Sequence, residues 1–315
     1  MKGIVPMSTQ TAVANKGGLG HWARSKSGKK TITTITFLFI PLVLLILFTI
    51  IPAINMVIFS FQSRDQLGVT VDWVGFDNYV TIFTQSEYWT TFTTSLYYLV
   101  GSFVQQIFAL LVATILCSKI KFANFFKGIL FFPYMMNGVA VSLIFRRFFQ
   151  GAGIGNGNTG TLNTILQAFG VEPIKWLTDP NLVNICLVFA SIWRYIGFDI
   201  LMYIGAIQSI PPDIYEAADL DGANGWHKFR YIIFPSIRPI ITLQLIMAIK
   251  GAISVYEIPY IITGGKMGSA TFLIKTMDTA FVYNKIGLAS AMAIVMLIII
   301  LIVTGIQKLV FREKD

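Results

Sequence analysis

Apolar residues follow one another along this chain in long segments instead of alternating with polar ones. Four such segments carry charged side chains at most near their ends, and two others carry two charged side chains each within them. Each segment reaches the roughly 20 residues with which an apolar helix spans a bilayer. Because backbone groups in lipid must hydrogen-bond within their own segment, we expect helices. The predicted membrane helices are residues 32–60, 93–117, 127–149, 182–208, 239–261 and 286–308.

The composition supports this all-α integral membrane fold with six transmembrane helices. Hydrophobic residues make up 55% of the 315 residues and charged residues only 12%, about half of what is usual in a soluble domain. Residues 1–30 are basic and rich in Gly and Ser, which predicts a disordered tail that serves as a topological anchor. The first apolar segment is too long for the core of a cleaved signal peptide. We therefore expect one transmembrane domain over residues 31–310.

Lys and Arg are distributed unevenly between the two sides of the predicted helices. With the N-terminus in the cytoplasm, 15 of the 24 Lys and Arg residues fall on the cytoplasmic side and seven on the outer side. Such an excess marks the cytoplasmic side of a membrane protein. The tail decides this prediction, because without its six residues the count is nine against seven. Both termini are therefore predicted to be cytoplasmic, and we interpret the net charge of +9 as a topology signal, not as a nucleic-acid-binding surface.

Residues with the chemistry of an enzyme or a metal site do not cluster in this sequence. The Gly-rich segment 151–160 lacks the Lys that a phosphate-binding loop requires. Cys117 and Cys186 lie on separate predicted helices. His21 lies in the tail and His227 in a long loop, so no Cys/His metal motif arises. We therefore expect no catalytic residue, no metal ligand and no cofactor in this chain.

A polar stretch of about thirty residues, 210–239, separates the fourth and fifth predicted helices and faces the cytoplasm in this topology. Two prolines end the preceding helix, and Asp213 followed by Glu216 three residues later predicts a capped helix start. Gly222 predicts the end of this short helix, and a second one is expected within residues 224–235. Local physics leaves two interpretations open: an amphipathic hairpin on the membrane surface, or a rigid pair of helices presented to a partner.

The string EAADLDGANGWHKFRYIIFPSIRP, residues 216–239, resembles the EAA loop of binding-protein-dependent ABC importer permeases. In that family the loop inserts into a groove on a separate cytoplasmic ATPase and transmits its closure. The resemblance implies that ATPase coupling involves Glu216, Ala217, Ala218, Asp219, Gly222, Phe229 and Pro235.

Three further segments resemble the carbohydrate-uptake branch of that family, in the style of maltose and glycerol-phosphate permeases. They are WVGFDNYVTIF (73–83), FFPYMMNGVAVSLIFRRFF (131–149) and ITGGKMGSATFLIKTMDTAF (262–281). Phe234 stands where the family's loop usually has Leu before its Pro, and Lys266 and Met267 replace a Gly and a Pro of the third segment. The resemblance covers about residues 35–310.

The resemblance implies a subunit of a larger machine in the bacterial inner membrane, in contact with lipid and carrying a sugar or related polar solute. The expected partners are a second permease subunit, two ATP-binding subunits and an external solute-binding protein, with ATP and Mg bound by the ATPase. The alternative is a self-contained secondary transporter, for which inverted repeats are typical; we see no such repeat between the halves. A purely structural scaffold leaves the charges within the predicted helices unexplained.

Polar side chains recur at helical spacing within the fourth and fifth predicted helices. Ionisable groups at such positions are costly in lipid and usually face a cavity or one another. One interpretation is a hydrogen-bonding path for solute hydroxyls; the other is that two cations and two anions form interhelical pairs with a structural role. The candidate path residues are Trp193, Tyr195, Asp199, Tyr203, Lys250, Ser254 and Glu257.

Overall fold

The computed structural model describes residues 26–64, 71–118, 120–151 and 159–310. It divides into two compact units after Met56, and each is described by itself. Most of the predicted disordered tail lies outside the described residues, although its last residues, from Lys26 onward, already belong to a helix. Most of the Gly-rich segment 151–160 also lies outside them.

The first unit is a helical rod. Helix α2 (Lys26–Leu45) passes through a π-helical turn (Ile46–Ile50) into α3 (Ile51–Phe59), whose last residues belong to the second unit. The stretch Thr33–Phe59 is apolar and long enough to cross a membrane, and none of its most apolar window is buried within the chain. A helix that is apolar all round and unburied by its own chain is typical of a membrane span.

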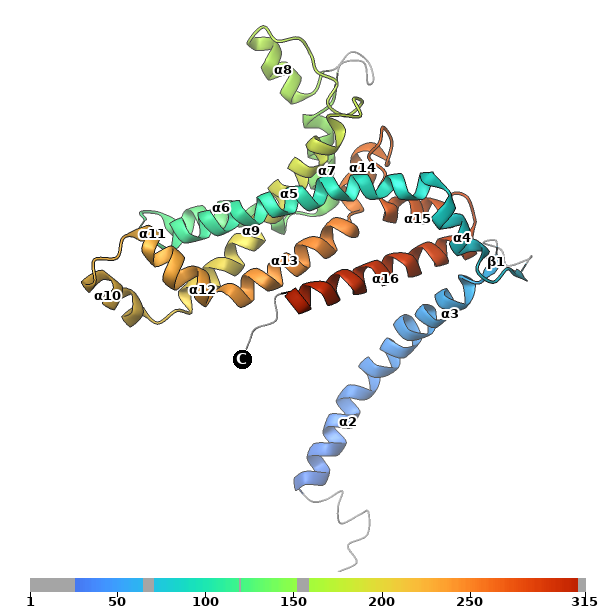
Figure 1. The fold of residues 1–315 in the computed structure, drawn as a ribbon, viewed down its shortest axis with the longest axis horizontal. Helices are drawn as coiled ribbons and strands as arrows, with labels where there is room; N and C mark the ends of the chain where they lie inside the picture. The colour runs from blue at the N-terminus through green and yellow to red at the C-terminus, as the bar shows by residue number, and fades with distance from the viewer. Residues whose placement is uncertain (1–25, 65–70, 119, 152–158, 311–315) are drawn as a thin grey trace, which may run out of the picture. The chain divides into compact units, whose positions relative to one another are not determined.

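The second unit is almost entirely helical, which confirms the predicted all-α fold class. Among its described residues, one short antiparallel pair of strands is present, in which Ser63 faces Asp72. The elements, labelled in Figure 1, are β1 (Gln62–Arg64), β2 (Val71–Trp73), α4 (Asp77–Thr84), α5 (Ser86–Cys117), α6 (Ala123–Met135), α7 (Gly138–Phe148), α8 (Thr161–Ala168), α9 (Val183–Gln208), α10 (Pro212–Leu220), α11 (Gly225–Lys228), a π-helical turn (Phe229–Ile233), α12 (Phe234–Ser236), α13 (Arg238–Ile253), α14 (Glu257–Thr263), α15 (Phe272–Phe281) and α16 (Ile286–Val310).

Five described helical stretches are long and apolar enough to cross a membrane, and a bent pair brings the total to six. The bent pair is α6 and α7, which meet at 95°, so the third predicted helix is broken where a straight one was expected. Asn137 makes this break by capping α7, since its Oδ1 accepts the N–H of Val139 at 2.8 Å. The fifth predicted helix is also interrupted, between α13 and α14, and the second begins at Ser86 instead of residue 93.

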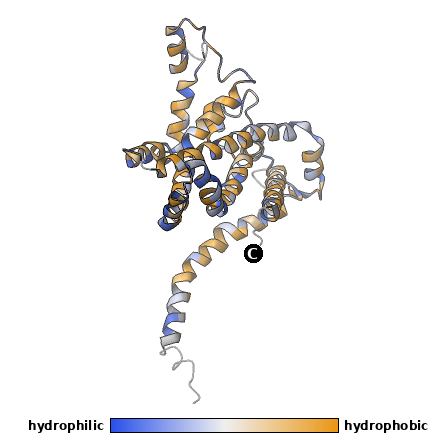
Figure 2. Ribbon diagram, turned by 60° about the vertical axis from the view of Figure 1, so that its left-hand side comes forward, coloured by the Kyte–Doolittle hydropathy of each residue, from blue (hydrophilic) through white to orange (hydrophobic). Residues whose placement is uncertain are grey.

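Helices α5, α9, α13 and α16 run side by side and form the body of this unit (Figure 1). Hydrophobic residues dominate these long helices (Figure 2). Glycines permit the closest approaches: a Cβ on Gly101 of α5 would collide with Val188 of α9, and one on Gly197 of α9 would collide with the carbonyl of Leu130 in α6. Small residues at such crossings let membrane helices pack by van der Waals contact, because lipid offers little hydrophobic driving force between helices.

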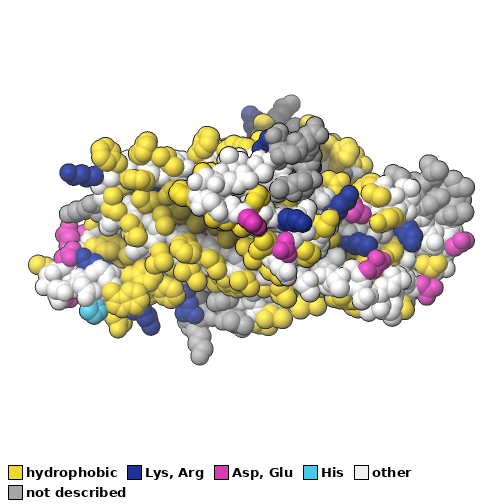
Figure 3. Space-filling view, turned by 90° about the horizontal axis from the view of Figure 1, so that it is seen from above, with side chains coloured by type: hydrophobic (Ala, Val, Ile, Leu, Met, Phe, Trp, Pro, Cys, Tyr) yellow, Lys and Arg dark blue, Asp and Glu magenta, His cyan; other side chains and the backbone are white. Residues whose placement is uncertain are grey.

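Seen from above, the face of the molecule shows a broad hydrophobic stretch between two groups of charged side chains (Figure 3). One group belongs to the end that carries α10 and α11 in Figure 1, and the other extends from the centre of the view to the end that carries α4 and the strands. A broad surface without charged side chains is what is expected where a protein contacts hydrocarbon.

Candidate functional site

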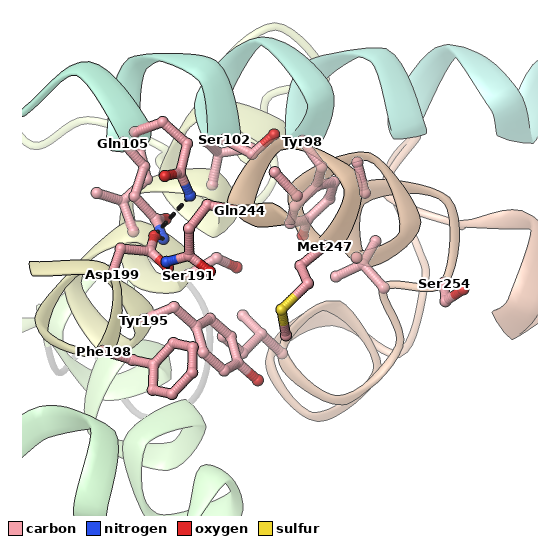
Figure 4. A pocket seen from close by; sticks show the side chains of 18 of the residues that line it. Tyr98, Ser102, Gln105, Ser191, Tyr195, Phe198, Asp199, Gln244, Met247 and Ser254 are labelled. Carbon is pink, nitrogen blue, oxygen red and sulfur yellow. Dashed lines mark hydrogen bonds between the residues drawn. The ribbon is translucent and has the colours of Figure 1, made fainter. Parts of the chain in front are cut away.

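A cavity of about 520 Å³ lies between α5, α9, α13 and the interruption before α14. This volume is in the range of small-molecule sites, which are mostly apolar with a few polar groups that fix orientation. Figure 4 shows side chains from α5, α9 and α13 converging on it. Its polar lining residues are Tyr98, Ser102, Gln105, Gln106, Tyr134, Ser191, Tyr195, Asp199, Gln244, Ser254, Tyr256 and Glu257.

The Asp199 carboxylate sits at one end of this cavity and is held by three glutamine side chains. Gln105 Nε2 and Gln106 Nε2 donate to its Oδ2 at 2.6 and 2.9 Å, and Gln244 Nε2 donates to its Oδ1 at 3.0 Å. The residue is only 6% exposed. Burial of a carboxylate is tolerated where hydrogen bonds replace its water shell, so the three amides account for its stability at this depth.

Tyr203 supports this cluster from behind. Its hydroxyl donates to Gln106 Oε1 at 2.6 Å, which turns the amide so that Nε2 faces Asp199. Tyr203 is 1% exposed and does not line the cavity. The Tyr195, Asp199 and Tyr203 stripe predicted on α9 therefore divides into two groups: the first two residues face the cavity, and the third orients a neighbour.

An ion pair between Arg194 and Glu257 lies at the wall of the cavity, next to the break before α7 and the break before α14. Arg194 Nη1 donates to Glu257 Oε2 at 2.5 Å, and the two side chains are 13% and 39% exposed. Glu257 is the first residue of α14, and the pair lies against Gly138, the first residue of α7, where a Cβ would collide with both charged groups. This glycine lets the broken third segment pass directly over the pair.

The predicted path residues separate into two sets. Tyr195, Asp199, Ser254 and Glu257 line the cavity, whereas Trp193, Tyr203 and Lys250 do not. The other interpretation was that the charged side chains pair with one another. Arg194 and Glu257 do form such a pair. Asp199 instead accepts hydrogen bonds from amides, and Lys250 is exposed.

The glutamines at positions 105, 106 and 244 are the main functional candidates that the sequence reading missed. A signal for them existed: uncharged amides within long apolar segments are costly in lipid unless they find partners. The predicted path was built around the charged positions of the fourth and fifth predicted helices, so Gln105 and Gln106 of the second helix and Gln244 fell outside it.

The cytoplasmic loop predicted at 210–239 folds as two short helices. Helix α10 ends at Leu220, and Gly222 adopts a left-handed φ of +75° while Ala223 N–H donates to Ala218 O at 2.9 Å. This is the glycine-terminated helix end that was predicted. Asn224 caps α11 by accepting the N–H of His227 at 2.9 Å.

The predicted start of α10 is wrong. Pro211 occupies the N-cap position and Pro212 begins the helix, with no side-chain capping bond. Asp213 lies inside the first turn and Glu216 further along, so they do not form a capping box. The physical reason is that Pro at the first helical position needs no N–H partner and already has a helical φ.

One side of this loop is anchored and the other is presented outward. Tyr215 and Phe229 pack against a buried apolar cluster that includes Leu116, Ile207 and Ile233, and this burial raises the pKa of the Tyr215 phenol. Lys228 Nζ pairs with Asp219 and so joins α11 to α10. The outward residues are Glu216, Ala217, Asp219, Leu220, Gly222 and Pro235, and Leu220 is 91% exposed.

Comparison with known proteins agrees with this architecture. The chain matches the family described as "Binding-protein-dependent transport system inner membrane component" over residues 105–314. It is 32% identical to the probable ABC transporter permease protein YurN of Bacillus subtilis, over 88% of this chain and 96% of that protein. It is also 32% identical to the arabinooligosaccharides transport system permease protein AraP of Bacillus subtilis, over 83% of each.

A solved structure shares the fold. It is the crystal structure of a bacterial ABC transporter involved in the import of the acidic polysaccharide alginate; the similarity covers 90% of this chain and 96% of that one, with a TM-score of 0.78 and 22% sequence identity. The EAA-like loop, the membrane helices and these matches lead to one conclusion. The chain belongs to the binding-protein-dependent transport system inner membrane components and is a multi-pass permease subunit of an ABC importer, not a self-contained secondary transporter.

Proposed function

We propose that this permease carries a sugar or a related polar solute through the cavity that Asp199 and its three glutamines terminate. The supporting observation is that cavity: it places the buried side chains of Asp199, Gln105, Gln106 and Gln244 among apolar helices, where a solute is out of bulk water. Relatives named as permeases for arabinooligosaccharides and for multiple sugars support the class of solute. Alternating exposure of the cavity to the two sides of the membrane then moves the solute.

The same proposal assigns the loop of α10 and α11 to coupling with a separate ATPase. Two short helices joined by the Lys228–Asp219 pair and anchored on the membrane helices form a stiff element that moves as one body. ATP and Mg bind in that ATPase. Two copies of the ATPase act on the cytoplasmic side of this chain and of a second permease subunit. Both termini of this chain lie in the cytoplasm. A solute-binding protein delivers the solute from outside, consistent with the solved alginate transporter in complex with its periplasmic protein.

An uptake assay tests the cavity assignment. Cells whose only copy of this permease carries Gln244→Leu are compared with cells that carry Gln167→Leu, which makes the same chemical change at an exposed position of α8. Labelled arabino-oligosaccharide, maltose, trehalose and lactose serve as solutes. We expect the wild type and Gln167→Leu to take up at least one of them equally, and Gln244→Leu to lose most of that uptake at an equal membrane level. Equal uptake by both variants would contradict the assignment.

A further inference from the structure

The residues that line the cavity carry a net negative charge, and this charge affects which solutes can enter. We propose, building on the transport role above, that Asp199 makes the cavity an electrostatic filter that admits neutral or cationic polyhydroxylated solutes and rejects those that carry carboxylate or sulfate groups. The filter is the carboxylate together with the three amides that donate hydrogen bonds to it.

The hydrogen bonds show that Asp199 acts as an acceptor on both oxygens. Two amide N–H groups point at Oδ2 and one at Oδ1, and Tyr203 fixes the direction of the Gln106 amide. A protonated carboxyl would turn an O–H toward donors, whereas the ionised form accepts from all of them, and hydrogen bonding to the charged form favours it. The three amides therefore offset part of the cost of burying a negative charge that no cation pairs with among the described residues.

No cation offsets this charge at the cavity wall. The lining residues include two carboxylates, Asp199 and Glu257, and no Lys, Arg or His. Arg194 neutralises Glu257 by direct pairing, which leaves Asp199 as the charge without a pairing cation among the described residues that line the cavity. A concave site lined by one sign of charge within low-dielectric walls focuses its potential on whatever enters.

The acceptor-rich end of the cavity also decides which groups bind. Gln105 Oε1 and Gln244 Oε1 take part in no hydrogen bond among the described residues, so they remain acceptors beside the carboxylate. A sugar hydroxyl donates to such oxygens, and an ammonium group donates while also neutralising the charge. A carboxylate or sulfate has no proton to donate and is repelled.

Charged thiol reagents measure this potential without knowledge of the solute. A Cys at position 102, where Ser lines the cavity one turn before the glutamines, is introduced after Cys117→Ser and Cys186→Ala. The assembled importer in permeabilised membranes reacts with a trimethylammonioethyl or a sulfonatoethyl methanethiosulfonate, and the mass of this chain reports each rate. The quantity of interest is the ratio of cationic to anionic rates, relative to the ratio for an exposed Gln167→Cys.

We expect a ratio at least about tenfold above the exposed reference, because the reagents differ by two charges and Asp199 lines the same cavity as position 102. Asp199→Asn should remove this excess, and Asp199→Glu should retain it. Asp72→Asn, the same change at an exposed residue of β2, should leave it intact.

The outcomes separate the two proposals. If Ser102→Cys reacts with neither reagent while Gln167→Cys reacts with both, the cavity is not an aqueous path, and the transport proposal fails together with the filter. If both reagents react and the ratio equals that of the exposed reference, or survives Asp199→Asn unchanged, the filter alone is wrong. If Asp199→Asn does not assemble, the ratio measured for Ser102→Cys with Asp199 unchanged still tests the filter.

Discussion

Gly222 holds a left-handed turn between α10 and α11, and its replacement by Ala should loosen the coupling loop. Its φ is +75°, and a Cβ placed there would meet nothing within 4 Å. The substitution therefore creates no clash, and its whole effect comes from the backbone conformation. Gly225 provides a matched control three residues later: a Cβ there also meets nothing within 4 Å, but its φ is not left-handed.

The expected magnitude follows from these two conformations. An L-residue in the left-handed region costs about 1–2 kcal/mol relative to Gly, which multiplies the population of the opened turn about 5- to 30-fold. At Gly225, inside the first turn of α11, Ala restricts the unfolded chain and fits the helix, so the change should be neutral or stabilising by about 0.5–1 kcal/mol.

Hydrogen exchange on the purified importer reports the opening directly. The N–H of Ala223, which donates to Ala218 O, should exchange about 5- to 30-fold faster in Gly222→Ala after correction for intrinsic rates, and no faster in Gly225→Ala. The amount of solute moved per ATP hydrolysed should fall in Gly222→Ala only. Equal exchange in the two variants would show that the backbone argument is wrong, and faster exchange with unchanged coupling would show that loop stiffness does not matter for transport.

Three further predictions concern the loop, the ion pair and the source of energy. Glu216→Ala should uncouple ATP hydrolysis from uptake without unfolding α10, because Glu216 is exposed and makes no capping bond; Asp221→Ala is the control, and circular dichroism with ATPase assays checks both. Gly138→Ala should lower the melting temperature of the purified protein, because its Cβ displaces the Arg194–Glu257 pair, while Gly128→Ala, with open space around it, should not. The isolated chain should not hydrolyse ATP in a phosphate-release assay; hydrolysis that survives removal of contaminating ATPases would contradict this.

The sequence alone determined those features that depend on neighbouring residues. Long apolar segments require helices because lipid offers no partner to the backbone, and the all-α membrane fold predicted from them is confirmed. The turn at Gly222 and a second helix beginning next to Asn224 were also predicted correctly, since each depends on a few adjacent residues. The predicted start of α10 at Asp213 was wrong for a local reason, namely the preference of Pro212 for the first helical position.

Only the tertiary structure decided which polar groups meet. Asp199 is joined to glutamines 94, 93 and 45 residues away, and Arg194 to a carboxylate 63 residues away. Helical spacing shows which residues share a face, but how each helix is rotated and crossed depends on packing against the others, for instance at Gly101 and Gly197. The breaks between α6 and α7 and between α13 and α14 also change which way the side chains after each break point. For that reason the sequence named Asp199 as a candidate, while its amide partners and its lack of a cation emerge only from the fold.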